Sequence, residues 1–340
     1  MDKLRVAILG YGRTGSTMHA GAIETIEDFQ VAAVCDVVPE KLKQAQERFG
    51  CKVYKNHRRM LAAEKLDLVS VLTRSGQHCR MACDCLRAGV NVLVTKPWCV
   101  NERQARRMVA TAEESGKLLL PWLPARWSDD LARLREVVAS GRIGKVYCVR
   151  RAVCGFGKRN DWQTQRKCGG GYILNWGPHV VDTAVQLTGR KVRSVYAWTR
   201  QVIDPGDVED SFFAVLTLDD GVVVHTERTV AIEGPPSWYI QGDRGTIVVR
   251  GREMTVRSAE PPAPDDPTQY SGMQTREPEV TTETVGPSAW GDEHRIYREV
   301  AQALRGGKQY PVKPLDALEL TRVLDAIRKS AQNNKVVTLD

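Results

Sequence analysis

Three polar side chains recur at helical spacing in the second half of the chain. Asn175, His179 and Asp182 stand at positions i, i+4 and i+7, so a single helix would carry all three on one face. Histidine is the side chain best suited to accept a proton near pH 7, which makes His179 a candidate general base. Glycines at 169–171 precede this segment and permit close approach of the backbone to a bulky ligand. We therefore expect a catalytic site here.

Pro178 bears on where this helix begins. A proline inside a helix clashes with the carbonyl group four residues earlier, so the regular helix is expected either to include Asn175 or to begin at Pro178. In the second case His179 lies in the first turn. The helix dipole would then lower the pKa of the imidazole, which suits a base that is neutral near pH 7.

A glycine motif near the N-terminus predicts a nucleotide site. The aliphatic run 4–9 predicts a strand, the spacing of apolar residues in 19–26 predicts a helix, and G-x-G-x-x-G lies between them. Gly10 allows a tight turn, Gly12 leaves room for a pyrophosphate, and Gly15 lets the helix pack on the sheet. The pyrophosphate would lie at the helix N-terminus. The predicted cofactor-binding residues of this turn are Gly10, Gly12, Arg13, Thr14 and Gly15.

Asp36 follows a second apolar run, 31–35, and indicates which dinucleotide binds. An acidic residue about 20 positions after the glycines accepts hydrogen bonds from the ribose diol of the adenosine. Its charge would repel a 2′-phosphate, so we predict NAD(H) in preference to NADP(H), a preference that Arg13 weakens slightly. The alternative is a glycine turn in an unrelated βα unit.

Strand and helix candidates alternate up to about residue 121, which predicts a doubly wound parallel sheet. We assign 1–121 to a dinucleotide-binding Rossmann domain. The predicted strands 66–72 and 90–94 end in loops that should border the cofactor, because ligands bind at the carboxyl ends of parallel strands. These loops add Thr73, His78, Lys96 and Pro97 to the predicted cofactor-binding residues.

Residues 122–340 show a different pattern and are assigned to a second, α+β domain. Short alternating strand candidates, with a hairpin signal at 219–221, predict an open and largely antiparallel sheet. The stretch 261–287 is expected to be a long loop, and helices are expected at 291–306 and 315–333. The last helix is a candidate to pack back on the first domain.

Composition limits the classes of protein to consider. The 340 residues, with 42% hydrophobic and 26% charged residues, exceed one ordinary core and fit two globular domains. We see no signal-peptide pattern and no run long enough for a membrane span, and expect a cytoplasmic protein. The net charge of +8 is dispersed, so no nucleic-acid partner is predicted. Nine irregularly spaced cysteines predict neither disulfides nor a metal site.

Three ordered motifs resemble the glucose-fructose oxidoreductase and inositol dehydrogenase (Gfo/Idh/MocA) family over nearly the whole chain. They are the glycine turn 10–15, the sequence Thr95-Lys96-Pro97, and the segment 175–182. The resemblance implies hydride transfer between NAD and a C–OH group of a sugar, sugar derivative or cyclic polyol. It makes His179 the base and Lys96 the group that hydrogen-bonds substrate and cofactor.

Two residues depart from the family pattern. Asn175 stands where the family has an aspartate that tunes the histidine, and an amide cannot raise the basicity of His179 as a carboxylate would. Thr95 replaces the usual glutamate and removes an anionic partner near Lys96. Asn175 is therefore expected to orient a substrate hydroxyl. Arg126 and Trp162, the latter in the aromatic and basic loop 155–167, are further candidates for lining the sugar pocket.

The resemblance leaves two alternatives to a dehydrogenase. One is an NAD-dependent glycosidase that works by transient oxidation and elimination, and the other is an NAD-binding sensor without turnover. By analogy with relatives, the open sheet of the second domain also predicts a homo-oligomer, a dimer or tetramer.

Overall fold

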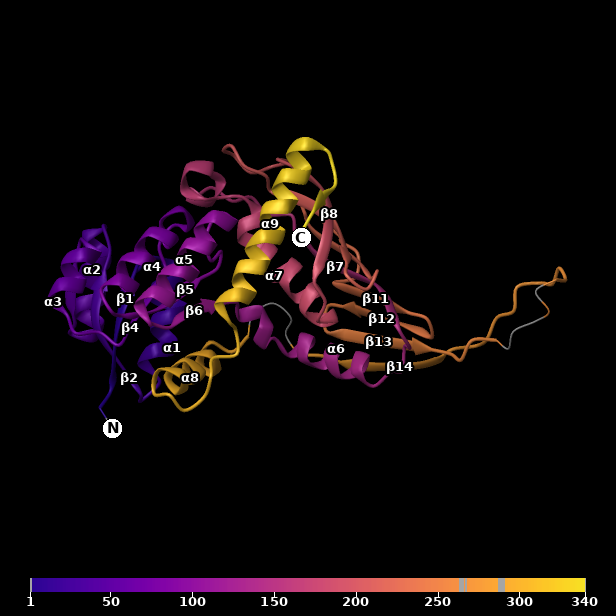
Figure 1. Ribbon diagram of the computed structural model, residues 1–340, viewed down its shortest axis with the longest axis horizontal. Coiled ribbons are helices and arrows are strands. Elements are labelled where there is room, and N and C mark those ends of the chain that lie inside the picture. The colour runs from indigo at the N-terminus through magenta and orange to yellow at the C-terminus, as the bar shows by residue number, and fades with distance from the viewer. Residues whose placement is uncertain (1, 263–265, 267, 287–290, 340) are drawn as a thin grey trace.

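The computed structural model describes residues 2–262, 266, 268–286 and 291–339 and contains two sheets (Figure 1). The first is built from residues 4–122 and the second from residues 146–338. Two helices, α7 (Tyr172–Thr188) and α9 (Pro314–Asn333), lie between the Rossmann half of the molecule and the second sheet (Figure 1).

The first sheet has six strands in the order β3-β2-β1-β4-β5-β6. All neighbouring pairs are parallel, and most positions are buried, as expected for apolar runs covered on both faces. This is the doubly wound Rossmann order, so the predicted fold of the first domain is confirmed. The strands are β1 (Leu4–Leu9), β2 (Phe29–Cys35), β3 (Lys52–Tyr54), β4 (Leu68–Val71), β5 (Asn91–Thr95) and β6 (Leu119–Trp122).

Local sequence signals account for the helices of this domain. The helix after Asp36 begins at Pro39 and ends before Gly50, which has a left-handed φ of +59°. Asn101 caps another helix by accepting a hydrogen bond from the Gln104 amide at 3.0 Å. The helices are α1 (Ala20–Glu24), entered through a π-helical turn at Gly15–His19, α2 (Pro39–Phe49), α3 (His57–Ala63), α4 (His78–Arg87) and α5 (Glu102–Ser115).

The second sheet has nine strands in the order β14-β13-β12-β11-β7-β10-β9-β8-β15. Only β7 and β10 pair in parallel among these described strands, so the prediction of a largely antiparallel sheet is confirmed. The strands are β7 (Val146–Cys154), β8 (Val192–Arg200), β9 (Ser211–Leu218), β10 (Val223–Thr229), β11 (Trp238–Gly242), β12 (Gly245–Arg250), β13 (Glu253–Ser258), β14 (Glu279–Thr284) and β15 (Val337–Thr338).

Two local predictions for this domain have different outcomes. The signal at 219–221 is confirmed, because β9 and β10 form an antiparallel hairpin there. The expectation of an unbroken loop over 261–287 was wrong, because β14 lies within it and pairs with β13. The Thr and Glu residues of β14 place polar side chains at the sheet edge, a composition that on its own is typical of loops. Residues 263–265, 267 and 287 lie outside the described part.

Helices cover one face of the second sheet. Helix α6 (Asp129–Ala139) and helix α7 contact each other, while α9 contacts α5 of the first domain. Helix α8 (Glu293–Leu304) lies against α1, where Tyr297 packs on Trp122 with ring centroids 5.2 Å apart. The other face of the sheet exposes large aromatic side chains. No helix in the described ranges is long and apolar enough to cross a membrane.

Candidate active site

The glycine turn after β1 has the geometry that its three glycines predict. Gly10 has a φ of +101°, and a Cβ atom there would lie 2.8 Å from the backbone carbon of Leu72. A Cβ atom on Gly15 would lie 2.1 Å from the carbonyl oxygen of Gly10. At Gly12 a Cβ atom would meet nothing within 4 Å. Gly10 and Gly15 are therefore required by the fold of the turn, whereas Gly12 leaves space for a ligand.

Asp36 is held at the end of β2 by two backbone amides. Its Oδ2 accepts a hydrogen bond from Tyr11 at 2.7 Å, and its Oδ1 accepts one from Val38 at 2.9 Å. The carboxylate borders a cavity of about 490 Å³ that opens above the glycine turn. The predicted cofactor residues that line this cavity, here called the nucleotide cavity, are Gly10, Gly12, Arg13, Thr14, Gly15, Asp36 and Thr73.

The nucleotide cavity also contains residues that sequence reasoning did not assign to it. Lys41 and Lys55 add two positively charged side chains to its lining. Asp161, Trp162 and Gln163 reach it from the second half of the chain. Trp162 was predicted to line a substrate pocket, and in the structure it is among the residues that line the nucleotide cavity. The position of a long loop depends on distant contacts, so no local signal identified it.

His78, predicted to bind the cofactor, is buried and joins two loops. Its Nδ1 lies 2.8 Å from the carbonyl oxygen of Pro97, and its Nε2 lies 2.9 Å from that of Thr73. Burial lowers the pKa of this imidazole. His78 and Pro97 are not among the residues that line the nucleotide cavity. The histidine thus fixes the relative position of the loops that follow β4 and β5.

Lys96 follows β5 and reaches helix α7. Its Nζ donates to the side-chain oxygen of Asn175 at 2.9 Å and to the backbone oxygen of Asn175 at 3.1 Å. Burial lowers the pKa of Lys96 to about 7, and the positive charges of Arg159 and Arg13 act in the same direction. The predicted pair of Lys96 and Asn175 is therefore brought together by the fold, and the lysine titrates close to neutral pH.

His179 lies one turn after Asn175 in α7, which continues from Tyr172 to Thr188 through Pro178. Asn175, His179 and Asp182 therefore share one helix, and of the two helix starts that the sequence left open, the structure shows the one that includes Asn175. The pKa of His179 is lowered well below its usual value by burial first, and then by the charges of Lys96 and Arg151. The lowered pKa of His179 thus results from burial and neighbouring charges, because His179 is far from the helix N-terminus.

A second cavity, of about 450 Å³, lies beside His179 and is here called the His179 cavity. It is bounded by α7, by the end of β7 and by the segment before β11. Sequence reasoning missed most of its lining, including Arg151, Cys154 and Trp176. A signal for Arg151 was present: it stands between Val149 and Val153 at the buried positions of an alternating strand.

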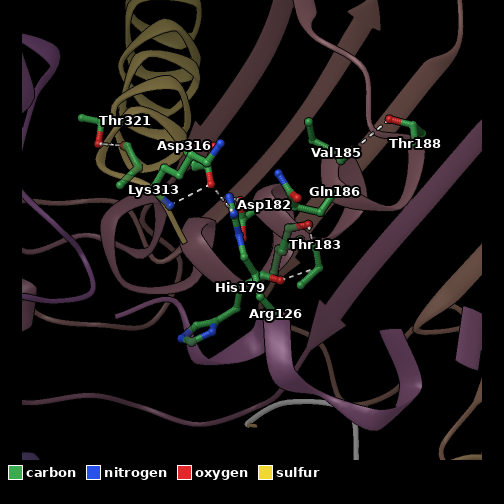
Figure 2. A network of polar contacts seen from close by, with 12 residues as sticks. Arg126, His179, Asp182, Thr183, Val185, Gln186, Thr188, Lys313, Asp316 and Thr321 are labelled. Carbon is green, nitrogen blue, oxygen red and sulfur yellow. Dashed lines mark hydrogen bonds and ion pairs between the residues drawn. The ribbon is translucent and has the colours of Figure 1, made fainter. Parts of the chain in front are cut away.

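Arg126 and Asp182 form a buried ion pair beneath this site. The guanidinium donates to both Asp182 oxygens, at 2.8 and 2.7 Å, and to Asp316 at 3.1 Å. Figure 2 shows this network, with the His179 ring directed away from it. Arg126 was predicted to contact substrate, and in the structure its nitrogens bind two carboxylates that join α7 to the start of α9.

Comparison with known proteins places the chain in a family. Residues 4–121 match the profile described as an oxidoreductase family with an NAD-binding Rossmann fold. Residues 131–248 match the profile of the GFO/IDH/MocA C-terminal domain. The chain belongs to the GFO/IDH/MocA family. The resemblance inferred from the three sequence motifs is therefore confirmed, and so is an oxidoreductase fold built on an NAD-binding Rossmann domain.

Individual known proteins are similar over most or all of the chain. D-glucoside 3-dehydrogenase of Escherichia coli is 33% identical over 67% of this chain and 71% of its own. Scyllo-inositol 2-dehydrogenase (NADP(+)) of Bacillus subtilis is 23% identical, covering 100% of this chain and 97% of its own. The crystal structure of an NAD-binding protein from Listeria innocua matches with a TM-score of 0.84 and 25% identity, covering 100% of both chains.

Proposed function

We propose that this protein is an NAD(H)-dependent dehydrogenase or reductase that acts on a C–OH or C=O group of a sugar, sugar derivative or cyclic polyol. The observation that carries the proposal is the contact of Lys96 with Asn175, one helical turn from His179. Lys96 follows a Rossmann strand and His179 lines a separate cavity, so this contact joins the two halves of the site. The names of the relatives from Escherichia coli and Bacillus subtilis support the substrate class.

The nucleotide cavity fits a dinucleotide. Gly12 leaves space for a pyrophosphate, and Asp36 presents a fixed carboxylate to a ribose diol. NAD supplies the hydride acceptor when it is bound. We infer a preference for NAD(H) because Asp36 would repel a 2′-phosphate, although Lys41 and Lys55 lie nearby.

His179 and Lys96 have different roles at the substrate oxygen: His179 accepts the proton, and Lys96 stabilises the negative charge. A neutral imidazole can accept the hydroxyl proton, and the pKa of His179 lies low enough to keep it neutral at pH 7. The protonated form of Lys96 stabilises the alkoxide that develops on the same oxygen. Asn175 orients Lys96 through its side-chain oxygen and leaves its amide NH₂ group for a substrate hydroxyl.

The test is the formation of NADH, followed by absorbance, when the protein is mixed with NAD and a panel of sugars, inositols and glycosides. We expect NADH with one class of substrate, and a loss of at least about a hundredfold in kcat for His179→Ala. Retained binding of NADH shows that the variant is folded. NAD binding without NADH formation on any compound would contradict the proposal. Release of sugar from a glycoside would then identify an NAD-dependent glycosidase, and no product at all a sensor.

We also propose a homo-oligomer, a dimer or tetramer formed through the open face of the second sheet. Tyr147, Tyr196 and Trp198 expose 52%, 43% and 44% of their surface there. Exposed aromatic groups gathered on one sheet face mark an interaction surface. Light scattering should give the mass of an oligomer, and Trp198→Glu should shift it towards the monomer. A monomeric wild type would contradict this assignment.

A further inference from the structure

Two buried arginines lie on the sheet surface that faces α7, next to His179. Arg151 of β7 is 4% exposed and Arg228 of β10 is 6% exposed. The two strands pair in parallel with Thr226 opposite Arg151, so Arg228 lies two residues further along the neighbouring strand. Arginine is almost never buried without a partner. The positions of these two side chains therefore call for an explanation.

The polar atoms of this group are only partly satisfied. Nη1 of Arg151 donates to the backbone oxygen of Ser237 at 3.0 Å, and more weakly to that of Ala152 at 3.4 Å. The Nε atoms of Arg151 and Arg228 and the hydroxyl of Thr226 are buried and have no hydrogen-bond partner among the described residues. Three buried polar groups without a hydrogen-bond partner in the described part of the chain thus lie close together on the paired strands β7 and β10.

Neither guanidinium has a carboxylate to neutralise it. No ion pair within the described ranges includes Arg151 or Arg228. Asp130 acts on Arg151 electrostatically without pairing with it, and its own oxygens accept hydrogen bonds from Trp238 and Leu131. Arg228 also donates through Nη1 to the backbone oxygen of Thr229. Burial of a charge without an ion-pair partner is costly, and hydrogen bonds to backbone oxygens offset this cost only in part.

Aromatic rings hold the guanidiniums in place without removing their charge. Arg151 lies over Trp238 at 4.6 Å, and Arg228 lies over Tyr172 at 4.9 Å and Trp176 at 5.5 Å. Stacking uses the face of a guanidinium and leaves its edge, which carries the N–H groups, available to a planar anion. The rings therefore preorganise a site for an anionic group.

An anionic group would contact Arg151 from the His179 cavity. Arg151 and Trp176 both line it, together with His179. Its two other charged lining residues, Glu233 and Arg250, are exposed and opposite in sign, so they offset each other. The buried charge that remains is positive.

We propose that the substrate carries an anionic substituent, a carboxylate or a phosphate, which binds to Arg151 in the His179 cavity, with Arg228 adding positive charge behind Trp176. The inference rests on the proposed function and narrows it from sugars in general to sugar acids or sugar phosphates. Arg151 contacts the substituent directly, and the hydroxyl to be oxidised faces His179.

The experiment measures binding and turnover on matched pairs of ligands, with the protein saturated with NADH or NAD so that anion sites of the nucleotide cavity are filled. The probes are D-glucuronate, D-galacturonate and D-mannuronate, each compared with its uronamide and its parent hexose. Hexose 6-phosphates and inorganic phosphate form the second arm. Calorimetry reports affinity, and NADH formation reports kcat and KM.

We expect at least one anionic probe to bind about ten- to a hundredfold more tightly than its neutral partner, the range for hydrogen bonds to a charged group. If a uronate binds more tightly than its neutral partners, the substituent is a carboxylate. If a hexose phosphate does, the substituent is a phosphate. Arg151→Gln should remove the preference. Arg150→Gln is the matched control, because Arg150 lies on the opposite face of the same strand, over Tyr239 at 5.7 Å.

Three results would overturn the proposal: equal binding of anionic and neutral probes, failure of every anion to bind, or a preference that survives in Arg151→Gln. Circular dichroism and NADH binding check the fold of each variant. If Arg151→Gln does not fold, Arg151→Lys is the second variant. It keeps the charge but loses the paired N–H donors of the guanidinium, so it should keep only part of the preference for anionic probes. Turnover of neutral sugars alone would support the proposed dehydrogenase and contradict the anionic substrate. Anion binding without NADH formation would support the anion site and contradict the dehydrogenase.

Discussion

Lys96 directs its amino group at Asn175, whose side-chain oxygen lies 2.9 Å away. An amide oxygen accepts this hydrogen bond but contributes no negative charge, and burial lowers the pKa of the lysine to about 7. The amine is thus divided between its charged and neutral forms at neutral pH. The resemblance to the family implies an aspartate at this position, and we expect its replacement by Asn175 to affect the charge of Lys96 more directly than that of His179.

The charge on Lys96 predicts a pH dependence. If the ammonium form stabilises the alkoxide, kcat/KM for oxidation should fall as pH rises through about 7. Asn175→Asp places a carboxylate beside Nζ, which raises the pKa of Lys96 and should move this fall to higher pH. Titration of His179 should cause no change in kcat/KM near pH 6.5, because the pKa of His179 lies well below that value. Activity that instead rises through pH 7 would show that neutral Lys96 is the base.

The glycine turn offers a matched pair of substitutions. Gly15→Ala brings a Cβ atom 2.1 Å from the Gly10 oxygen, so we expect it to lower the free energy of unfolding by more than about 2 kcal/mol. Gly12→Ala meets no atom within 4 Å and should change stability by less than about 0.5 kcal/mol. It should nevertheless weaken NADH binding about tenfold or more, because the methyl group occupies the pyrophosphate space. Urea unfolding and fluorescence titration measure the two effects, and equal loss of stability in both variants would argue against this division of roles.

Asp36 should decide which dinucleotide is used. Asp36→Ser removes the repulsion of a 2′-phosphate while Arg13, Lys41 and Lys55 remain in the cavity. We expect the Kd for NADH to rise about tenfold and the Kd for NADPH to fall. Glu40→Gln makes the same change of charge nearby without touching the cavity, and should leave both constants as they are. A wild type that already prefers NADPH would refute the assignment.

The ion pair between Arg126 and Asp182 is predicted to act on stability. Arg126→Met leaves a 3% exposed carboxylate unpaired, at a cost of about 3–5 kcal/mol in the free energy of unfolding. Adding Asp182→Asn should restore part of this loss, because the orphaned charge is then absent. Chemical denaturation of the two single variants and the double variant gives the coupling. Strictly additive losses would show that the pair has no interaction energy.

Sequence reasoning was most successful where local chemistry determines structure. The glycine turn, the alternation of strands and helices, and the shared face of Asn175 and His179 follow from short-range rules. It failed where the outcome depends on distant partners. Asp182 lies 56 residues from Arg126, and no local pattern shows that they meet. For the helix that contains Pro178, the sequence left two starting points open, because the packing that decides between them is not contained in a helix rule.

The crossing of Trp162 into the nucleotide cavity has a thermodynamic consequence. A dinucleotide bound there would touch the Rossmann sheet and a segment of the other half of the chain together. Its binding free energy would then act as a reversible cross-link, raising the melting temperature of both halves with ligand concentration. Where the two halves unfold in separate transitions without NADH, we expect these to merge into one cooperative transition when NADH is saturating.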